Sequence, residues 1–142
     1  KSGENIQKRS KRTSAEINRQ GLIAEFAICQ HFAIDPLRHV TRNGSDGGVD
    51  LVLPGSDKTL QIKYTPVKNG MLIAGNNQPI TADVVIMTER CGGMLDVRVV
   101  GYTTREEFYK RAKRKRFRAN LPLDYYVPGA TLWPIRDIWG VL

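Results

Sequence analysis

Residues 47–65 read GGVDLVLPGSDKTLQIKYT, and this stretch decides the fold. Two short apolar segments flank the turn sequence PGSDK, which is typical of a β-hairpin. Side chains along a strand alternate between its faces, so Gln61 and Lys63 share the face opposite Leu60. Antiparallel pairing brings Asp50 beside Gln61 or Lys63, and the sequence leaves the choice of register open.

The rest of the chain predicts further strands and two helices around this hairpin. Thr13 and Glu16 form a capping box at the start of the first helix, and Thr103 and Glu106 form another at the start of the second, which runs into 110–118. We expect strands at 38–42, 49–53, 59–65, 82–88, 95–102 and 124–128, an irregular segment at 66–80 and a closing turn or short helix at 132–140. This order predicts a mixed α/β fold, with a central sheet flanked by helices.

The bulk composition predicts one soluble domain with an anionic partner. The chain has 142 residues, and we expect 13–142 to form a single domain behind a flexible basic arm, 1–12. A net charge of +8 and a pI near 9.8 favour binding to nucleic acid. No apolar face accompanies the basic runs, which argues against a membrane partner. The two cysteines lack metal-ligand spacing, and Cys29 falls in an apolar helical pattern, which fits a reducing, cytoplasmic location.

Glu25 is the one charged residue between Gly21 and Cys29. Its neighbours at helical spacing are small or apolar, so Glu25 falls on the face expected to pack inward. A buried carboxylate without a partner is costly, and a metal ion, a lysine or a solvated cleft would each relieve that cost.

Together these residues predict a site for a hard divalent cation. Glu25, Asp50 and the Gln61 side-chain oxygen are the oxygen ligands that Mg²⁺, or Mn²⁺ in its place, accepts in proteins. Lys63 would orient a water molecule or stabilise negative charge on a phosphate. Such a site suits the hydrolysis of a phosphodiester bond.

Asp50, followed on the next strand by Gln61-Ile62-Lys63, with Glu25 on a preceding helix, resembles the PD-(D/E)XK nuclease superfamily. The resemblance covers about residues 13–102 and implies a restriction-endonuclease-like fold. It implies that Asp50 is the central metal ligand, that Lys63 is the catalytic lysine and that Glu25 is the helix-borne acid. Gln61 departs from the pattern, because it holds the position usually occupied by Asp or Glu and brings no charge.

The segment RNGSDGGVD, 42–50, also resembles the loop of archaeal-type Holliday junction resolvases, in which an arginine and a serine precede the aspartate. That resemblance implies that Arg42 and Ser45 contact phosphate. Val49 replaces the proline that is common before the aspartate.

Two basic segments are predicted to bind DNA. Seven of the nine residues of KRAKRKRFR, 110–118, are basic, and such a density repels itself without a counter-charge. The predicted contacts are Lys8, Arg9, Lys11 and Arg12 in the arm and Lys113, Arg114, Lys115, Arg116 and Arg118 in the second segment.

The sequence therefore predicts an Mg²⁺-dependent DNA endonuclease of the phage or homing type, acting on double-stranded or branched DNA as a homodimer or higher homo-oligomer. A Holliday junction resolvase is the alternative within this class, and a non-catalytic nucleic-acid-binding module is the alternative outside it. Each site residue also has a structural interpretation: Glu25 as an ion pair with Arg19 or a lysine, Asp50 as a turn residue, and Lys63 as an edge-strand lysine that discourages aggregation.

Overall fold

The computed structural model describes residues 14–33, 40–42, 49–52, 56–75, 79–93, 96–117 and 119–142, with the backbone alone for 14, 17, 18, 40–42, 49 and 50. The elements in chain order are α2 (Ser14–His31), β1 (Val40–Arg42), β2 (Val49–Val52), β3 (Thr59–Thr65), β4 (Met71–Ala74), β5 (Val84–Arg90), β6 (Val97–Thr104), α4 (Arg105–Arg111), β7 (Lys113–Lys115), β8 (Asp124–Pro128), and the 3₁₀ helices η1 (Gly129–Thr131) and η2 (Ile135–Gly140). The predicted arm at 1–12 and the predicted cap Thr13 lie outside the described residues.

The predicted hairpin is confirmed as part of a five-stranded sheet of order β1-β2-β3-β5-β6. Strands β1, β2 and β3 pair antiparallel, β3 pairs parallel with β5, and β5 pairs antiparallel with β6. Strand β3 is therefore central, with β2 on one side and β5 on the other.

The chain that links the parallel strands β3 and β5 differs from the prediction. We expected an irregular segment over 66–80, but Met71–Ala74 forms β4. Parallel strands need a crossover, which is usually a helix, and here the described part of the crossover contains a strand instead. That strand pairs with β8, near the other end of the chain.

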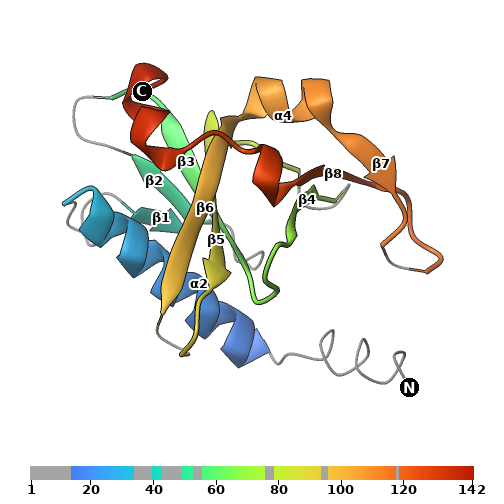
Figure 1. Cartoon of the computed structure of the whole chain (residues 1–142), viewed down its shortest axis with the longest axis horizontal. Coiled ribbons are helices and arrows are strands. Elements are labelled where there is room, and N and C mark those ends of the chain that lie inside the picture. Colours follow the sequence, from blue (N-terminus) through green and yellow to red (C-terminus); the bar gives the residue numbers. More distant parts are fainter. Residues whose placement is uncertain are drawn as a thin grey trace.

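Strands β4, β8 and β7 form a second, antiparallel sheet in that order. Helix α2 covers one face of the five-stranded sheet, and the smaller sheet lies on the other side together with α4 (Figure 1). The mixed α/β fold is thus confirmed, although a sheet rather than a helix provides much of the second layer.

Each face of the large sheet has its own core. The α2 side is filled by Ala24, Ile28, Leu60, Ile62 and Ile86 among others. On the other side, side chains of β5 pack against the small sheet and α4; this second core contains Leu72, Ala74, Ile80, Val85, Met87, Phe108 and Val127. Alternation along β3 and β5 therefore divides their side chains between two buried layers.

The predicted start of the second helix was one residue early. Thr104 is the N-cap of α4, and its hydroxyl accepts a hydrogen bond from the Glu107 N–H at 3.1 Å. Thr103 is fully buried, because β6 continues to Thr104, which pairs with Val84.

The second helix also ends earlier than predicted. It stops at Arg111, and the basic residues Lys113–Lys115 form β7. The remaining predicted strands and the short C-terminal helix are present with boundaries shifted by a few residues. Among the described residues, no helix combines the length and the apolar character needed to cross a bilayer.

Candidate functional site

The register of the β2–β3 hairpin places Asp50 directly opposite Gln61. Of the two registers that the sequence allowed, the structure therefore selects this one. Asp50 has a strand partner on each side, since Thr41 of β1 pairs with it as well. Asp50 is the second residue of β2, and the alternative in which it caps the preceding turn stays a prediction, because that turn lies outside the described residues.

Gln61 and Lys63 lie on the face of the sheet that points away from α2. In the parallel register Gln61 is beside Val85 and Lys63 is beside Met87, and both β5 residues belong to the second core. Because residues directly opposite in an antiparallel pair share a face, position 50 belongs to this face as well. The sheet therefore brings an aspartate, an amide and a lysine to neighbouring positions.

Lys63 is half-buried on the central strand of the sheet. The Thr88 hydroxyl donates a hydrogen bond of 2.8 Å to its carbonyl oxygen, which reinforces the parallel pairing of β3 with β5. On the β2 side the described pairing of β3 ends at Ile62, so Lys63 pairs with β5 alone among the described residues, and its alternative role as an edge lysine stays a prediction.

Gln61 is 7% exposed, and its side-chain oxygen Oε1 is sealed from solvent without a hydrogen-bond partner in the described part of the chain. A buried acceptor that lacks a partner costs about 1–3 kcal/mol relative to a satisfied one. Such atoms are rare in folded proteins, and an ordered water or a bound ion can supply the missing partner. An amide oxygen beside an aspartate position fits a hard cation such as Mg²⁺.

Glu25 is buried as predicted, with 3% of its surface exposed. However, α2 packs on the face formed by Leu60 and Ile62, which is opposite to the face of Gln61. The fold thus brings positions 50, 61 and 63 together on one face of the sheet, whereas Glu25 lies on the helix that packs against the other face. The described residues show no ion pair between Glu25 and Arg19. The alternative pairing of Glu25 with a lysine and its metal role both stay predictions.

Several predicted contact residues are not described. Lys8, Arg9, Lys11, Arg12, Ser45 and Arg118 lie outside the described residues. Of Arg42 only the backbone is described: it pairs with Val49, and the preceding Thr41 pairs with Asp50. The basic residues of β7 are described and exposed.

Sequence reasoning missed a buried carboxylate near this face. Glu89 is 2% exposed, accepts a hydrogen bond of 2.9 Å from the Arg98 guanidinium, and accepts another of 3.3 Å from the Asn69 N–H. In the parallel register it lies beside Thr65, two residues beyond Lys63. Glu89 therefore ties the segment after β3 to the sheet, and continuing the alternation of VVIMT, 84–88, one residue further would have found it.

A second missed residue, Asp83, fixes the start of β3 against β5. Its carboxylate accepts hydrogen bonds from the Thr59 N–H at 2.9 Å and the Thr59 hydroxyl at 3.2 Å, and its own N–H donates to that hydroxyl at 3.1 Å. The hydrogen bonds from Thr59, with the positive charge of Arg105, hold the pKa of Asp83 below its ordinary value of 3.8. These hydrogen bonds lie two residues before Gln61 and help to set the register of β3 against β5.

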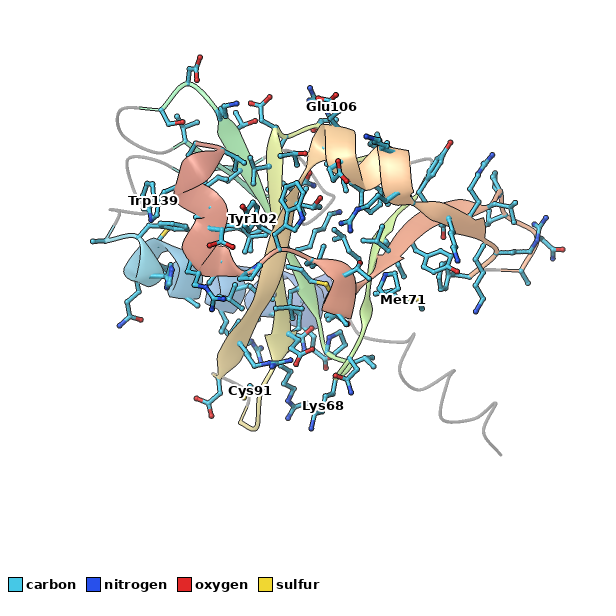
Figure 2. The ribbon with its side chains drawn as sticks, turned by 45° about the horizontal axis from the view of Figure 1, so that its top comes forward. Lys68, Met71, Cys91, Tyr102, Glu106 and Trp139 are labelled. Carbon is cyan, nitrogen blue, oxygen red and sulfur yellow. The ribbon has the colours of Figure 1, made fainter. Side chains whose placement is uncertain are left out.

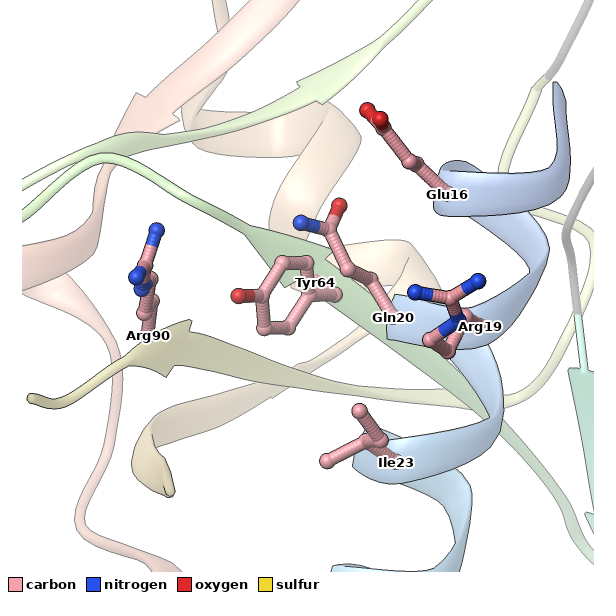
Figure 3. Close-up of a pocket in the computed structure, with 6 residues that line it drawn as sticks. All are labelled: Glu16, Arg19, Gln20, Ile23, Tyr64 and Arg90. Atoms are coloured by element: carbon pink, nitrogen blue, oxygen red, sulfur yellow. The ribbon is translucent and has the colours of Figure 1, made fainter. Parts of the chain in front are cut away.

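A pocket lies on the α2 side of the sheet. It is open to solvent and is lined by Glu16, Arg19, Gln20, Ile23, Tyr64 and Arg90. Figure 3 shows Tyr64 between the α2 side chains and Arg90. None of the lining residues is a predicted metal ligand, and Tyr64 belongs to the strand face opposite to Gln61 and Lys63, so this pocket is separate from their site.

Among the described side chains, no group of three or more His, Cys, Asp or Glu residues could hold a metal ion. The aspartate of position 50 is described by its backbone alone, and Gln61 would supply an amide oxygen rather than a carboxylate. Comparison with known protein families, curated proteins and solved structures found no match to the chain. Its function therefore has to be argued from its own residues.

Proposed function

We propose that this protein is a metal-dependent DNA endonuclease of the PD-(D/E)XK type, in which Gln61 replaces the usual second carboxylate. One observation carries the proposal: Asp50 and Gln61 are direct partners across β2 and β3, Lys63 follows on the same face, and the Gln61 oxygen is buried without a hydrogen-bond partner among the described residues. That combination supports a cation site with a lysine beside it.

In the proposed site, Asp50 and Gln61 hold Mg²⁺ or Mn²⁺. When bound, the divalent ion would act as a Lewis acid toward the scissile phosphate and would lower the pKa of water. Gln61 contributes a carbonyl oxygen without charge, so Asp50 carries the negative charge that the strands offer. Glu25 is the sequence-predicted source of a second charge, but α2 packs on the opposite face of the sheet, so Asp50 is the only carboxylate assigned to the ion in this proposal.

Lys63 would stabilise the negative charge that develops on the phosphate during cleavage. It is half-buried, with Gln61 two residues before it on the same face and Met87 beside it in the next strand. Because its side chain is restricted, Lys63 would keep its ammonium group close to the reacting phosphate. The electrostatic attraction between the two groups is stronger in a partly desolvated site than in water.

The substrate in this proposal is duplex DNA. The net charge of +8 and the exposed cations of β7 support a polyanionic partner. Cutting both strands, or both arms of a branch, requires two such sites, so the proposed enzyme acts as a homodimer or higher homo-oligomer.

The test is cleavage of supercoiled plasmid and of a four-way junction in Mg²⁺ and in EDTA. Asp50→Ala should abolish Mg²⁺-dependent cleavage, whereas the matched control Asp57→Ala, an exposed aspartate in the turn of the same hairpin, should cut like the wild type. Preference for plasmid supports the endonuclease, and preference for the junction supports a resolvase. DNA binding without cleavage under any divalent cation would refute the proposal in favour of a non-catalytic module.

A further inference from the structure

The β7–β8 ribbon is the outer part of the small sheet, in which β8 pairs with β7 on one edge and with β4 on the other. Figures 1 and 2 show it beyond α4, on the side away from β1 and β2. Strand β7 is at the edge of the small sheet, and Lys113, Arg114, Lys115 and the following Arg116 are all exposed. The ribbon thus presents four consecutive cations on an element with one open edge.

The cations of the ribbon form no ion pair with the described side chains, although Asp124 is the cross-strand partner of Lys115. In the described part of the chain, no carboxylate lies within ion-pair distance of Lys113, Arg114, Lys115 or Arg116, although Arg98, Arg105 and Arg111 each pair with an acid. Consecutive like charges repel one another, so this arrangement is more stable when an anion lies against it.

Aromatic rings hold the cations in place. The Arg114 guanidinium lies 4.8 Å from the centroid of the Tyr125 ring, and the Lys115 ammonium lies 5.4 Å from that of Phe117. Cation–π contacts restrict the long side chains without reducing their charge. The ribbon is therefore ordered before any partner binds, which lowers the entropic cost of binding.

The same rings argue against a single-stranded partner. Tyr125 packs edge-to-face with Tyr109, with centroids 5.3 Å apart, and Phe117 packs edge-to-face with Tyr126, with centroids 5.6 Å apart. Single-stranded nucleic acids bind through open aromatic faces on which bases stack. Here the rings of the ribbon pack against each other and against cations, so the charges rather than the rings are presented.

Alternation along β7 sets the direction of these charges. Arg114 pairs with Tyr125, which packs against the second core, so this face of the ribbon turns inward. Lys113 and Lys115 belong to the other face, with Tyr126. Two lysines two residues apart on one outward face can contact phosphates along one strand of a duplex.

We infer that the exposed β7 edge of the ribbon lies against the backbone of duplex DNA, with Lys113 and Lys115 contacting phosphates. This contact leaves β8 paired with β4, whereas insertion into the major groove would need a two-stranded ribbon free of β4. The inference rests on the proposed function for its choice of DNA as the partner. It adds a contact separate from the Asp50–Gln61 site, through which the protein positions the duplex.

The test measures binding of a 20-base-pair duplex by fluorescence anisotropy in EDTA, at salt concentrations from 50 to 300 mM. Each phosphate contact contributes about 0.9 to the slope of log K against log salt, so Lys113→Ala/Lys115→Ala should lower the slope by about 2 and weaken binding about 30-fold near 0.15 M salt. The control Lys58→Ala/Lys68→Ala removes two exposed lysines elsewhere and should leave the slope within 0.5 of the wild type. Equal slopes for the two double variants would overturn the inference.

A single-stranded competitor completes the test. The protein should bind the duplex more tightly than the single strand of the same sequence. Tighter binding of the single strand would overturn the inference. Binding is measured without metal and is therefore independent of cleavage. If the wild type cuts no DNA but the ribbon variant loses DNA binding, the proposed function is refuted and the ribbon inference stands.

Discussion

Replacing Gln61 by methionine should make the protein more stable and less active at the same time. Methionine has nearly the same length and shape as glutamine, and the side chain is 7% exposed beside Val85. The change removes an oxygen that is sealed from solvent without a partner among the described residues, which relieves a cost of about 1–3 kcal/mol. We expect the free energy of unfolding in EDTA to rise by about 1–2 kcal/mol, a shift in Tm of about 2–6 °C.

The same substitution removes the proposed metal ligand, so Mg²⁺-dependent plasmid cleavage should fall at least about 100-fold. Urea unfolding followed by circular dichroism gives the stability, and Gln30→Met is the matched control, because Gln30 is exposed on α2 and its replacement should change stability by less than about 0.5 kcal/mol. A loss of more than 1 kcal/mol in Gln61→Met alone would show that the oxygen is satisfied in solution. Cleavage at the wild-type rate would show that it is no ligand.

Three further substitutions test the frame around the site. A carboxylate with a depressed pKa stabilises the fold above its unfolded pKa and loses that effect as the pH falls through its folded pKa. Asp83→Asn should therefore lower the free energy of unfolding above about pH 4 and make its decline at lower pH less steep. Urea titrations from pH 2.5 to 6 measure both effects. Gly101→Ala would place a Cβ 2.6 Å from the Trp133 carbonyl oxygen and should cost about 1–3 kcal/mol by thermal unfolding, unless that segment shifts freely. Thr104→Ala should cost about 1 kcal/mol in the same assay, since the Glu107 N–H loses its acceptor, and an unchanged Tm would contradict the cap.

The hairpin was predictable because its signals are local. Alternation over 59–65 and a turn sequence before it fixed both strands, and the inward position of Glu25 followed from helical spacing. Which face α2 would cover was not predictable, since that depends on how the helix packs against strands far along the chain. The sequence therefore showed that Glu25 is buried but not that it lies on the opposite side of the sheet from Gln61.

Strands β4 and β7 were missed for a related reason. Both strands are short and pair with β8. Their extended conformation therefore depends on pairing with β8 and not on a local pattern in their own sequences. Lys113–Lys115 continues a basic run that looks helical, yet Ala112 takes an extended conformation and ends α4. Pairing with the tyrosines of β8 outweighs the helix propensity of lysine and arginine there.

The central claim is that Lys63 acts in phosphodiester cleavage beside the Asp50–Gln61 pair. The most direct measurement is the single-turnover rate of plasmid nicking in Mg²⁺ for Lys63→Ala and for Lys58→Ala, an exposed lysine of the same hairpin. The proposed site predicts that Lys63→Ala cuts at least about 100-fold more slowly than the wild type, while Lys58→Ala stays within about twofold of it. Equal rates for the two variants would contradict the site.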